Sequence, residues 1–264
     1  IIGLEGTVWH AEQHPSEGEA APFTPPAADL RYTGAGVMAG YARERGLFGI
    51  GLRGGSSYGE VDTPLLDGAT RATALAEARV RLTFSVSRLT IGMHGSGAYA
   101  AGRTSGEGWS RAITSGVLTL GTQRRWLRGD VVRGNVTRAE AGEAGRAFEY
   151  FVVGGSGSPY MDPAWLSQRV SLPPVPTGYA SGRRLGLYRA AIGGGVLEPY
   201  FLWVAAGDTL GDWKRILGAE RELALPSLGF ARLPGMRVRF GVGYSFDEPF
   251  KYRTRGYASV TYRP

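Results

Sequence analysis

A strict alternation of apolar and polar side chains is the feature that most limits how this chain can fold. Between Met236 and Phe246 every second residue is apolar, and the residues between them are Arg, Gly or Ser. Side chains on a β-strand point alternately to its two faces, so this segment predicts a strand with one apolar and one polar face. The same alternation recurs at residues 77–86, 89–94 and 48–52. The chain is therefore expected to be all-β.

Twelve segments carry this strand character, and some are longer than the roughly 5–6 residues usual in soluble sheets. They are residues 1–10, 31–43, 46–55, 72–86, 88–100, 110–122, 125–137, 182–192, 196–206, 218–231, 235–246 and 253–262. The Ala-rich stretch 72–78 could form a helix, but the alternation that follows it favours a strand. A weaker candidate at 146–153 lies inside the long stretch 138–181, which holds either no strand or two. The total is then twelve or fourteen, and we favour twelve.

The joins between these segments alternate in length along the chain. Short joins are expected at 44–45, 87–88, 123–124, 193–195 and 232–234. Longer joins are expected near 11–30, 56–71, 101–109, 138–181, 207–217 and 247–252. This alternation is typical of membrane barrels, which have tight periplasmic turns and longer external loops. It predicts a single domain over residues 1–264, built as a closed antiparallel transmembrane β-barrel with both termini on the periplasmic side.

The whole chain resembles bacterial outer-membrane β-barrel proteins in this pattern. Its end, Gly256–Pro264, carries the alternating hydrophobic residues typical of their last strand, although Arg263 and Pro264 follow the aromatic Tyr262. The resemblance implies an outer-membrane location, contact with lipid and lipopolysaccharide, and protein partners in a membrane complex. Because the chain begins with Ile1 rather than Met, we expect it to be a mature product or part of a longer protein.

Composition excludes several other classes. The chain has no Cys, which excludes disulfides, thiolate metal sites and thiol nucleophiles. No apolar run is long enough to cross a bilayer as a helix. The net charge is +7, but the arginines are scattered and no recognition motif accompanies them, so we expect no nucleic-acid partner. Matches to metal and dinucleotide motifs, at His10/His14 and Gly49–Gly54, are weak, and we expect neither a metal nor a cofactor.

One pair of residues suggests chemistry. His94 and Ser96 are two positions apart, so they share one strand face, where an imidazole and a hydroxyl could meet. The pair resembles the His and Ser of outer-membrane phospholipase A and lipid A deacylase, which implies a lipid hydrolase. The lipid-facing side of this strand is expected to carry Leu89, Ile91 and Met93, however. His94 and Ser96 are therefore expected to point into the lumen. Catalysis is the less favoured interpretation.

The polar face predicts what fills the barrel. The side chains expected to face the lumen are Arg79, Arg81, Arg189, Arg237, Arg239, Glu77, Glu198 and Glu222. They could pair across the bore, or they could line an anion-preferring pore. The stretch 138–181 is too long and too Pro-rich for an ordinary loop, so we expect it to fold into or across the bore.

A second resemblance falls within the same stretch. Phe151–Gly155, Arg169–Pro174 and Tyr179–Arg183 resemble the C-terminal barrels of larger surface proteins, including two-partner and assembly-type barrels. Three functions stay open: an anchor, scaffold or assembly component with a plugged bore, a passive anion-preferring pore, and a lipid hydrolase using His94 and Ser96. The first is favoured, so whether the chain is an enzyme stays open, with no enzymatic activity as the favoured expectation.

Overall fold

The chain folds almost entirely into β-strands. The computed structural model describes residues 2–13, 30–63, 66–124, 127–141, 151–154, 169–170, 180–193, 197–224, 227–228, 231–232, 236–247 and 253–262. Among these residues there is no helix long and apolar enough to cross a membrane. His14 of the weak metal motif lies outside them, and Gly49–Gly54 lies within a strand. The prediction of an all-β chain is confirmed.

Twelve strands form the main sheet, in the order β1-β2-β3-β4-β5-β6-β7-β11-β12-β13-β16-β17. Each pairs antiparallel with its neighbours, and the segment around Ala72–Ala78 is strand, as predicted. Their bounds are β1 (Ile2–Gln13), β2 (Leu30–Arg45), β3 (Phe48–Thr63), β4 (Leu66–Val86), β5 (Leu89–Thr104), β6 (Glu107–Arg124), β7 (Leu127–Ala141), β11 (Arg184–Ile192), β12 (Glu198–Gly207), β13 (Lys214–Ala224), β16 (Met236–Ser245) and β17 (Thr254–Tyr262).

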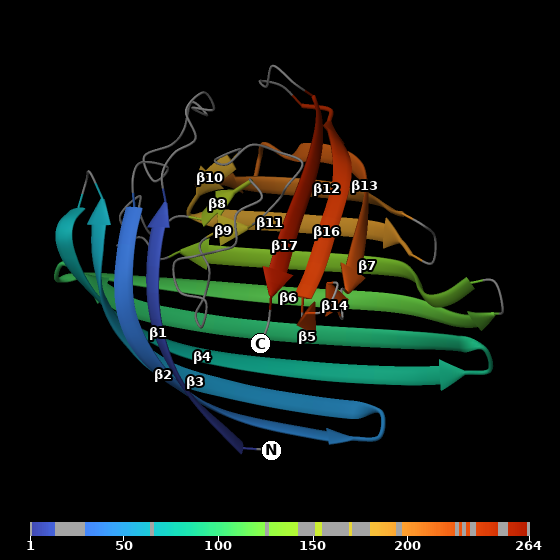
Figure 1. The fold of residues 1–264 in the computed structure, drawn as a ribbon, viewed down its shortest axis with the longest axis horizontal. Helices are drawn as coiled ribbons and strands as arrows, with labels where there is room; N and C mark the ends of the chain where they lie inside the picture. Colours follow the sequence, from blue (N-terminus) through green and yellow to red (C-terminus); the bar gives the residue numbers. More distant parts are fainter. Residues whose placement is uncertain are drawn as a thin grey trace.

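The main sheet curves around a hollow, with β1 and β17 as its two edges (Figure 1). No pairing joins β1 to β17 among the residues that the structure describes, so the sheet is not closed. An antiparallel sheet of twelve strands is therefore present, whereas the predicted closure is not established by these contacts.

The two ends of the sheet differ in their joins. At the end that we call the turn end, β1 begins, β17 ends, and the chain turns at 46–47, 87–88, 125–126, 193–197 and 225–235. The opposite, loop end has joins at 14–29, 64–65, 105–106, 142–183, 208–213 and 246–253. Long joins at 56–71 and 101–109 were expected, and this expectation is wrong. Strands β3 to β6 continue through those residues and leave only two-residue turns.

The strand predicted at 218–231 is also wrong in its bounds. β13 occupies 214–224, and the join after it carries a two-stranded sheet of β14 (Ser227–Leu228) and β15 (Ala231–Arg232). In the stretch 138–181, the weak candidate 146–153 is reduced to β8 (Phe151–Val153). β8 pairs with β9 (Arg169–Val170) and β10 (Ala180–Gly182) in a separate three-stranded sheet. The rest of the stretch from 142 to 179 lies outside the described residues.

The hydrophobic core lies inside the curve of the main sheet. Phe151 and Val153 of β8 are fully buried against the inner side chains of β11 to β13. Those partners are Leu185, Leu187, Ala191, Tyr200, Leu202, Val204 and Ile216. Figure 1 shows β8 to β10 within the hollow, beside β11 and β12. Part of the long stretch therefore does lie against the inner face.

Candidate functional site

The outer face of the main sheet is apolar from strand to strand. The cross-strand register aligns Phe84, Ile91, Leu120, Val132 and Ile192 side by side on β4 to β11. A second row lies beside it, formed by Phe48, Leu82, Met93 and Leu118. Large exposed hydrophobic side chains continue around the sheet to Leu217 on β13 and to Phe240 and Val242 on β16. We call this continuous surface the apolar belt.

Six alternating apolar residues of segments 77–86 and 236–246 all lie on this face: Val80, Leu82, Phe84, Val238, Phe240 and Val242. Val80, Phe84, Phe240 and Val242 are about 40% exposed, between 38% and 43%. Leu82 and Val238 occupy the same face, and they are half-buried. None of the six belongs to the hydrophobic core, which forms on the opposite face.

Aromatic rings border the belt at the loop end of β11 to β16. Phe201 lies 4.1 Å from Trp203 and 6.3 Å from Phe246, measured between ring centroids, and Tyr244 lies 5.1 Å from Phe246. Tyr188 contacts Trp213 nearby, with a centroid distance of 5.4 Å. Rings that are apolar in body and polar at one tip are enriched where a hydrocarbon layer meets water.

An ion pair between Arg215 and Asp247 lies beside these aromatic rings at the loop end. The backbone amide and the guanidinium of Arg215 donate hydrogen bonds to Asp247, which lies in the join between β16 and β17. Burial acts to raise the pKa of Asp247, but the hydrogen bonds from Arg215 outweigh it and hold that pKa below its ordinary value. Asp247 is therefore ionised at neutral pH and fixes the chain between the last two strands.

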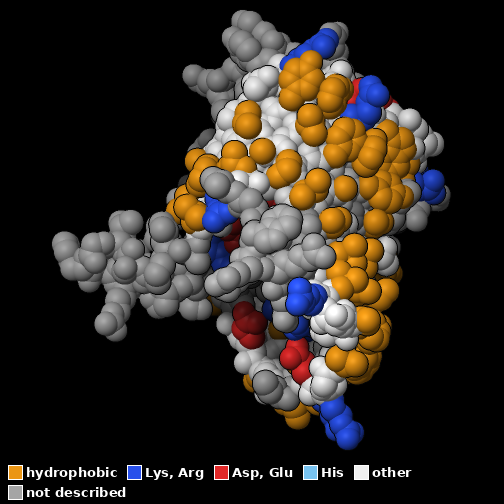
Figure 2. Space-filling model, turned by 90° about the vertical axis from the view of Figure 1, so that its right-hand side faces the viewer, with side chains coloured by type: hydrophobic (Ala, Val, Ile, Leu, Met, Phe, Trp, Pro, Cys, Tyr) orange, Lys and Arg blue, Asp and Glu red, His pale blue; other side chains and the backbone are white. Residues whose placement is uncertain are grey.

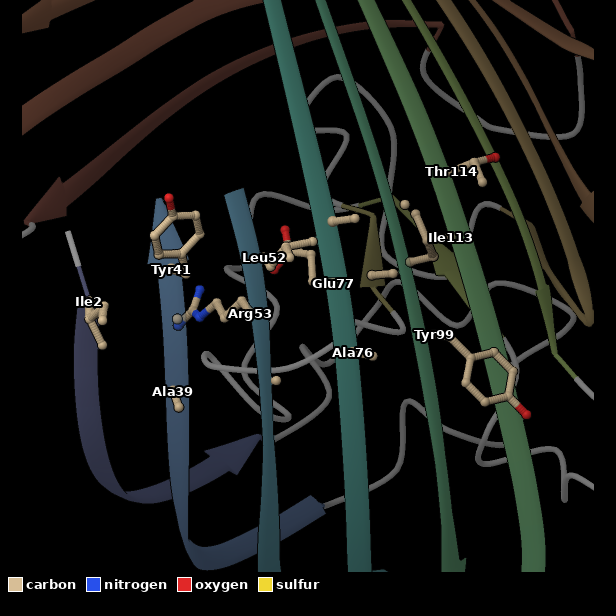
Figure 3. Close-up of a pocket in the computed structure, with 15 residues that line it drawn as sticks. Ile2, Ala39, Tyr41, Leu52, Arg53, Ala76, Glu77, Tyr99, Ile113 and Thr114 are labelled. Carbon is tan, nitrogen blue, oxygen red and sulfur yellow. The ribbon is translucent and has the colours of Figure 1, made fainter. Parts of the chain in front are cut away.

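The belt also contains a shallow apolar groove of about 730 Å³. Small residues on β2 to β5 form its floor, among them Ala39, Ala76 and Ala78. Figure 3 shows Tyr41 and Tyr99 on opposite sides of this groove, with Leu52 between them. The groove is a hollow in the outer surface, and the area that its lining exposes is mostly apolar.

The inner face near β11 to β17 is organised around one carboxylate, Glu220. Arg189 Nη2 lies 2.6 Å from its Oε1, and Arg239 donates from Nε at 3.0 Å and from Nη2 at 2.5 Å to Oε2. Tyr257 donates its hydroxyl to the same Oε2 at 2.6 Å. Arg189 also reaches Glu198 at 3.2 Å. Glu220 is buried, so these charge-assisted bonds replace the water that it lost on folding.

Two glycines make room for this cluster, which we call the Glu220 cluster (Glu220, Arg189, Arg239, Tyr257 and Glu198). Gly241 lies opposite Tyr257, and Gly218 lies opposite Tyr200, in the register of the sheet. A Cβ atom at either glycine would collide with the tyrosine ring beside it and with a backbone carbonyl. The Arg189 guanidinium lies 4.7 Å from the centroid of the Tyr200 ring. Because the two glycines have no side chain, the tyrosine rings can pack directly against the backbone. Side chains from five strands can then meet at the Glu220 carboxylate.

The inner face near β1 to β5 holds simpler pairs. Arg53 lies 3.2 Å from Glu5, Arg79 lies 2.5 Å from Glu77, and Arg81 lies 3.7 Å from Glu44. The side chains of Arg79 and Arg81 are 54% and 61% exposed, so water reaches this wall. A hollow of about 460 Å³ lies against Glu5, Arg53, Glu77 and Arg79. In Figure 2, acidic and basic side chains occupy the hollow in the lower half, and hydrophobic ones cover the outer surface.

The other predicted lumen residues share this face. Arg237 pairs with Glu222 at 2.6 Å, and both side chains are about half-exposed. Counted over the described inner face, six arginines (Arg53, Arg79, Arg81, Arg189, Arg237, Arg239) contact six glutamates (Glu5, Glu44, Glu77, Glu198, Glu220, Glu222). These paired charges balance one another, while the buried Arg71 and Arg111 add positive charge to the same face.

The structure places His94 and Ser96 on this inner face as well, opposite Arg81 and Arg79 in the register of β4 and β5. His94 is exposed and Ser96 is half-buried. Neither side chain points toward the apolar belt, where an enzyme that hydrolyses membrane lipid would meet its substrate. Within the described part of the chain, no group of three His, Asp or Glu side chains could hold a metal ion.

One buried cluster was not foreseen from the sequence. Trp109 lies between two guanidinium groups, with Arg71 Cζ at 4.3 Å and Arg111 Cζ at 4.6 Å from its ring centroid. All three side chains are at least 95% buried on the inner face near the loop end. Their positions on β4 and β6 alternate inward, but only the register brings them together.

The Glu220 cluster was foreseen only in part. The alternation assigned Arg189, Arg239 and Glu198 to the inner face, yet Glu220 and Tyr257 were not selected as site residues. A comparison of the chain with family models, curated proteins and solved structures finds no match in any of the three.

Proposed function

We propose that this chain is an outer-membrane β-barrel that serves as a membrane anchor, scaffold or assembly component, with its bore partly filled by the small sheet of β8 to β10 (Figure 1). The observation that carries the proposal is the distribution of hydrophobic and charged side chains over the two faces of the main sheet. Large hydrophobic side chains cover the convex outer surface, while ion pairs occupy the concave side. Contact with lipid explains the apolar belt, because the exposure of so many large hydrophobic side chains to water would be unfavourable.

The dimensions of the belt agree with a bilayer. The alternating run from Met236 to Phe246 covers ten residue steps, or about 33 Å along the strand. At the strand tilt of about 40° usual in barrels, this run spans about 25 Å across the membrane, which is the height of the apolar band in outer-membrane barrels. The aromatic border at the loop end fits the interface of such a band.

Lipid insertion is tested by charge placement. Leu82→Arg should reduce the free energy of unfolding by about 2–4 kcal/mol in lipid vesicles, because it puts a cation well inside the apolar belt, four residues from the end of β4 at Val86. Thr83→Arg, one residue away on the inner face, is the matched control and should change it by less than about 1 kcal/mol. Denaturant titration of the vesicle-bound protein measures both. Equal effects of the two variants would contradict the proposal.

Closure of the barrel belongs to the same proposal. With twelve strands, an even number, β1 and β17 run antiparallel, so they can pair and remove both open edges of the sheet. The chain has no Cys, which gives a clean background for paired cysteines on the two strands. We expect disulfides in membranes between residues that share a face, such as Glu5→Cys with Tyr257→Cys or Ser259→Cys. Absence of any such cross-link in the folded protein would refute closure.

A pore is the second candidate, supported by the half-exposed Arg79 and Arg81 and by the hollow beside them. The ion-paired glutamates weaken the anion preference expected from the arginines, but Arg71 and Arg111 leave an excess of positive charge on the inner face. Deleting residues 156–176 should raise the conductance in planar bilayers if this stretch fills the bore. Steady conductance of the parent, unchanged by the deletion, would favour the pore. As for the hydrolase, we expect the parent and Ser96→Ala to release no fatty acid from phospholipid vesicles or lipid A.

A further inference from the structure

The apolar belt reaches the rim of the molecule at the turn end. Leu47 lies in the turn between β2 and β3, Val86 ends β4, and Ile192 ends β11. These residues are 58%, 65% and 58% exposed. At the loop end, by contrast, strands β3 to β6 continue past the belt with polar outer residues such as Glu60, Asp62 and Arg103. The turns at the turn end thus barely leave the apolar region.

Three exposed arginines lie along that rim, and we call them the basic rim (Arg43, Arg45 and Arg88). Arg43 and Arg45 are on the outer face of β2, opposite Ile50 and Phe48 of β3. Arg88 lies in the two-residue turn between β4 and β5. Each is therefore next to exposed hydrophobic side chains, over which the methylene stem of an arginine can lie while its guanidinium stays in water.

The basic rim differs in its partners from the ion-paired arginines described above. Six arginines of the inner face contact glutamates, and Arg215 at the loop end contacts Asp247. No described residue forms an ion pair or hydrogen bond with the side chains of the basic rim. Guanidinium groups with open donors, at the edge of an apolar surface, match phosphate groups at the edge of a hydrocarbon layer in both charge and position.

We infer that the basic rim binds the head groups of anionic phospholipids in the leaflet at the turn end. This inference rests on the proposed membrane insertion and adds a lipid preference to it. The turn end carries the start of β1 and the end of β17, and short turns of this kind face the periplasm in outer-membrane barrels. That leaflet is made of phospholipid, which is why we assign the rim to phospholipid rather than to lipopolysaccharide.

The test is a lipid titration of the folded, detergent-solubilised protein followed by native mass spectrometry. Phosphatidylglycerol and phosphatidylcholine with the same acyl chains are added in parallel. We expect tighter binding of phosphatidylglycerol to the parent, weakened about fivefold for each arginine removed and therefore about 25-fold in the double variant Arg43→Gln/Arg45→Gln. Phosphatidylcholine binding should not change.

Arg237→Gln is the matched control. Arg237 is exposed to a similar extent, at 59% of its side chain, but it faces inward and pairs with Glu222. It should leave phosphatidylglycerol binding unchanged. If the double variant binds phosphatidylglycerol as tightly as the parent, or if Arg237→Gln weakens binding equally, the inference is overturned.

Failure of the inference and failure of the proposed function give different results. Insertion is measured in vesicles of pure phosphatidylcholine, where the basic rim has no anionic partner. A parent that inserts there but shows no preference for phosphatidylglycerol overturns the basic rim alone. A parent that does not insert overturns the membrane proposal, and the inference with it.

Discussion

The inner faces of the two halves of the sheet are built differently. Near β11 to β13 the inner side chains are buried, with Leu, Val and Ile packed against Phe151 and Val153 of β8 and the Glu220 cluster beside them. Near β1 to β5 the inner side chains are Arg and Glu in exposed pairs, beside a hollow. The half near β11 to β13 therefore has a buried core on its concave side. The concave side of the half near β1 to β5 is exposed to water, and we call this the wetted half. The same outer belt can therefore be supported from inside by packing or by ion pairs.

This difference is visible in the strand sequences. β4 alternates strictly near its end, with Arg79 and Arg81 between apolar neighbours. β12 has the nearly continuous apolar run Pro199–Ala206. A strand that is apolar on both faces is covered on both faces. In a barrel whose outer face meets lipid, such a run indicates that a segment of the chain lies against the inner side.

The largest expected effect separates the two halves by packing. Phe151→Ala should reduce the free energy of unfolding by about 3–5 kcal/mol, because it removes a fully buried ring from the core. Arg79→Ala, in the wetted half, should cost less than about 1 kcal/mol, since an exposed ion pair contributes little. Denaturant titration in vesicles measures both. Comparable losses would show that the two halves do not differ in the way we describe.

Charge burial should separate the halves as well. Glu220→Gln leaves Arg189 and Arg239 without their shared carboxylate in a buried place, and a loss of about 3 kcal/mol in the free energy of unfolding is expected. Glu44→Gln is the counterpart in the wetted half, where Glu44 is 73% exposed, and it should have little effect. The Glu220 cluster would be redundant if Glu220→Gln unfolded at the same denaturant concentration as the parent.

Glycine substitutions sharpen the same contrast at smaller scale. A Cβ atom at Gly218 would meet the Tyr200 ring and the carbonyl of Val242, so Gly218→Ala should cost about 1–3 kcal/mol through overpacking. A Cβ atom at Gly3, in the wetted half, would meet nothing within 4 Å. Gly3→Ala should therefore be close to neutral. The measurement is the unfolding midpoint of each variant against the parent.

The smallest effect concerns the loop end and depends on pH. The pKa of Asp247 is lowered in the folded state, so its contact with Arg215 stabilises the fold above the unfolded pKa, near 3.8. That contribution is lost as the pH falls through the folded value. Asp247→Asn should be slightly less stable than the parent at pH 6, by less than about 1 kcal/mol. The difference should disappear as the pH is lowered toward 2, and a difference that persists there would refute the assignment.

The sequence by itself determined most of the strand plan. Alternation at period two located twelve segments, and each overlaps a strand of the main sheet, because every strand with an apolar and a polar face leaves this pattern. It also assigned Val80, Phe84 and Phe240 to one face and Arg79 and Glu77 to the other. It missed the loop-end segments of β3 to β6, where outer residues such as Glu60, Asp62 and Arg103 are polar and the apolar signal fades.

Only the tertiary structure decided which side chains from different strands come into contact. Glu220, Arg239 and Tyr257 are far apart in sequence, and only the pairing of β13, β16 and β17 puts them in contact. The stack of Arg71, Trp109 and Arg111 depends on register in the same way. Long-range pairing fixes such contacts through the offset between strands, which a local pattern does not contain. The local pattern predicts which face each side chain occupies, and the fold determines which neighbours it contacts there.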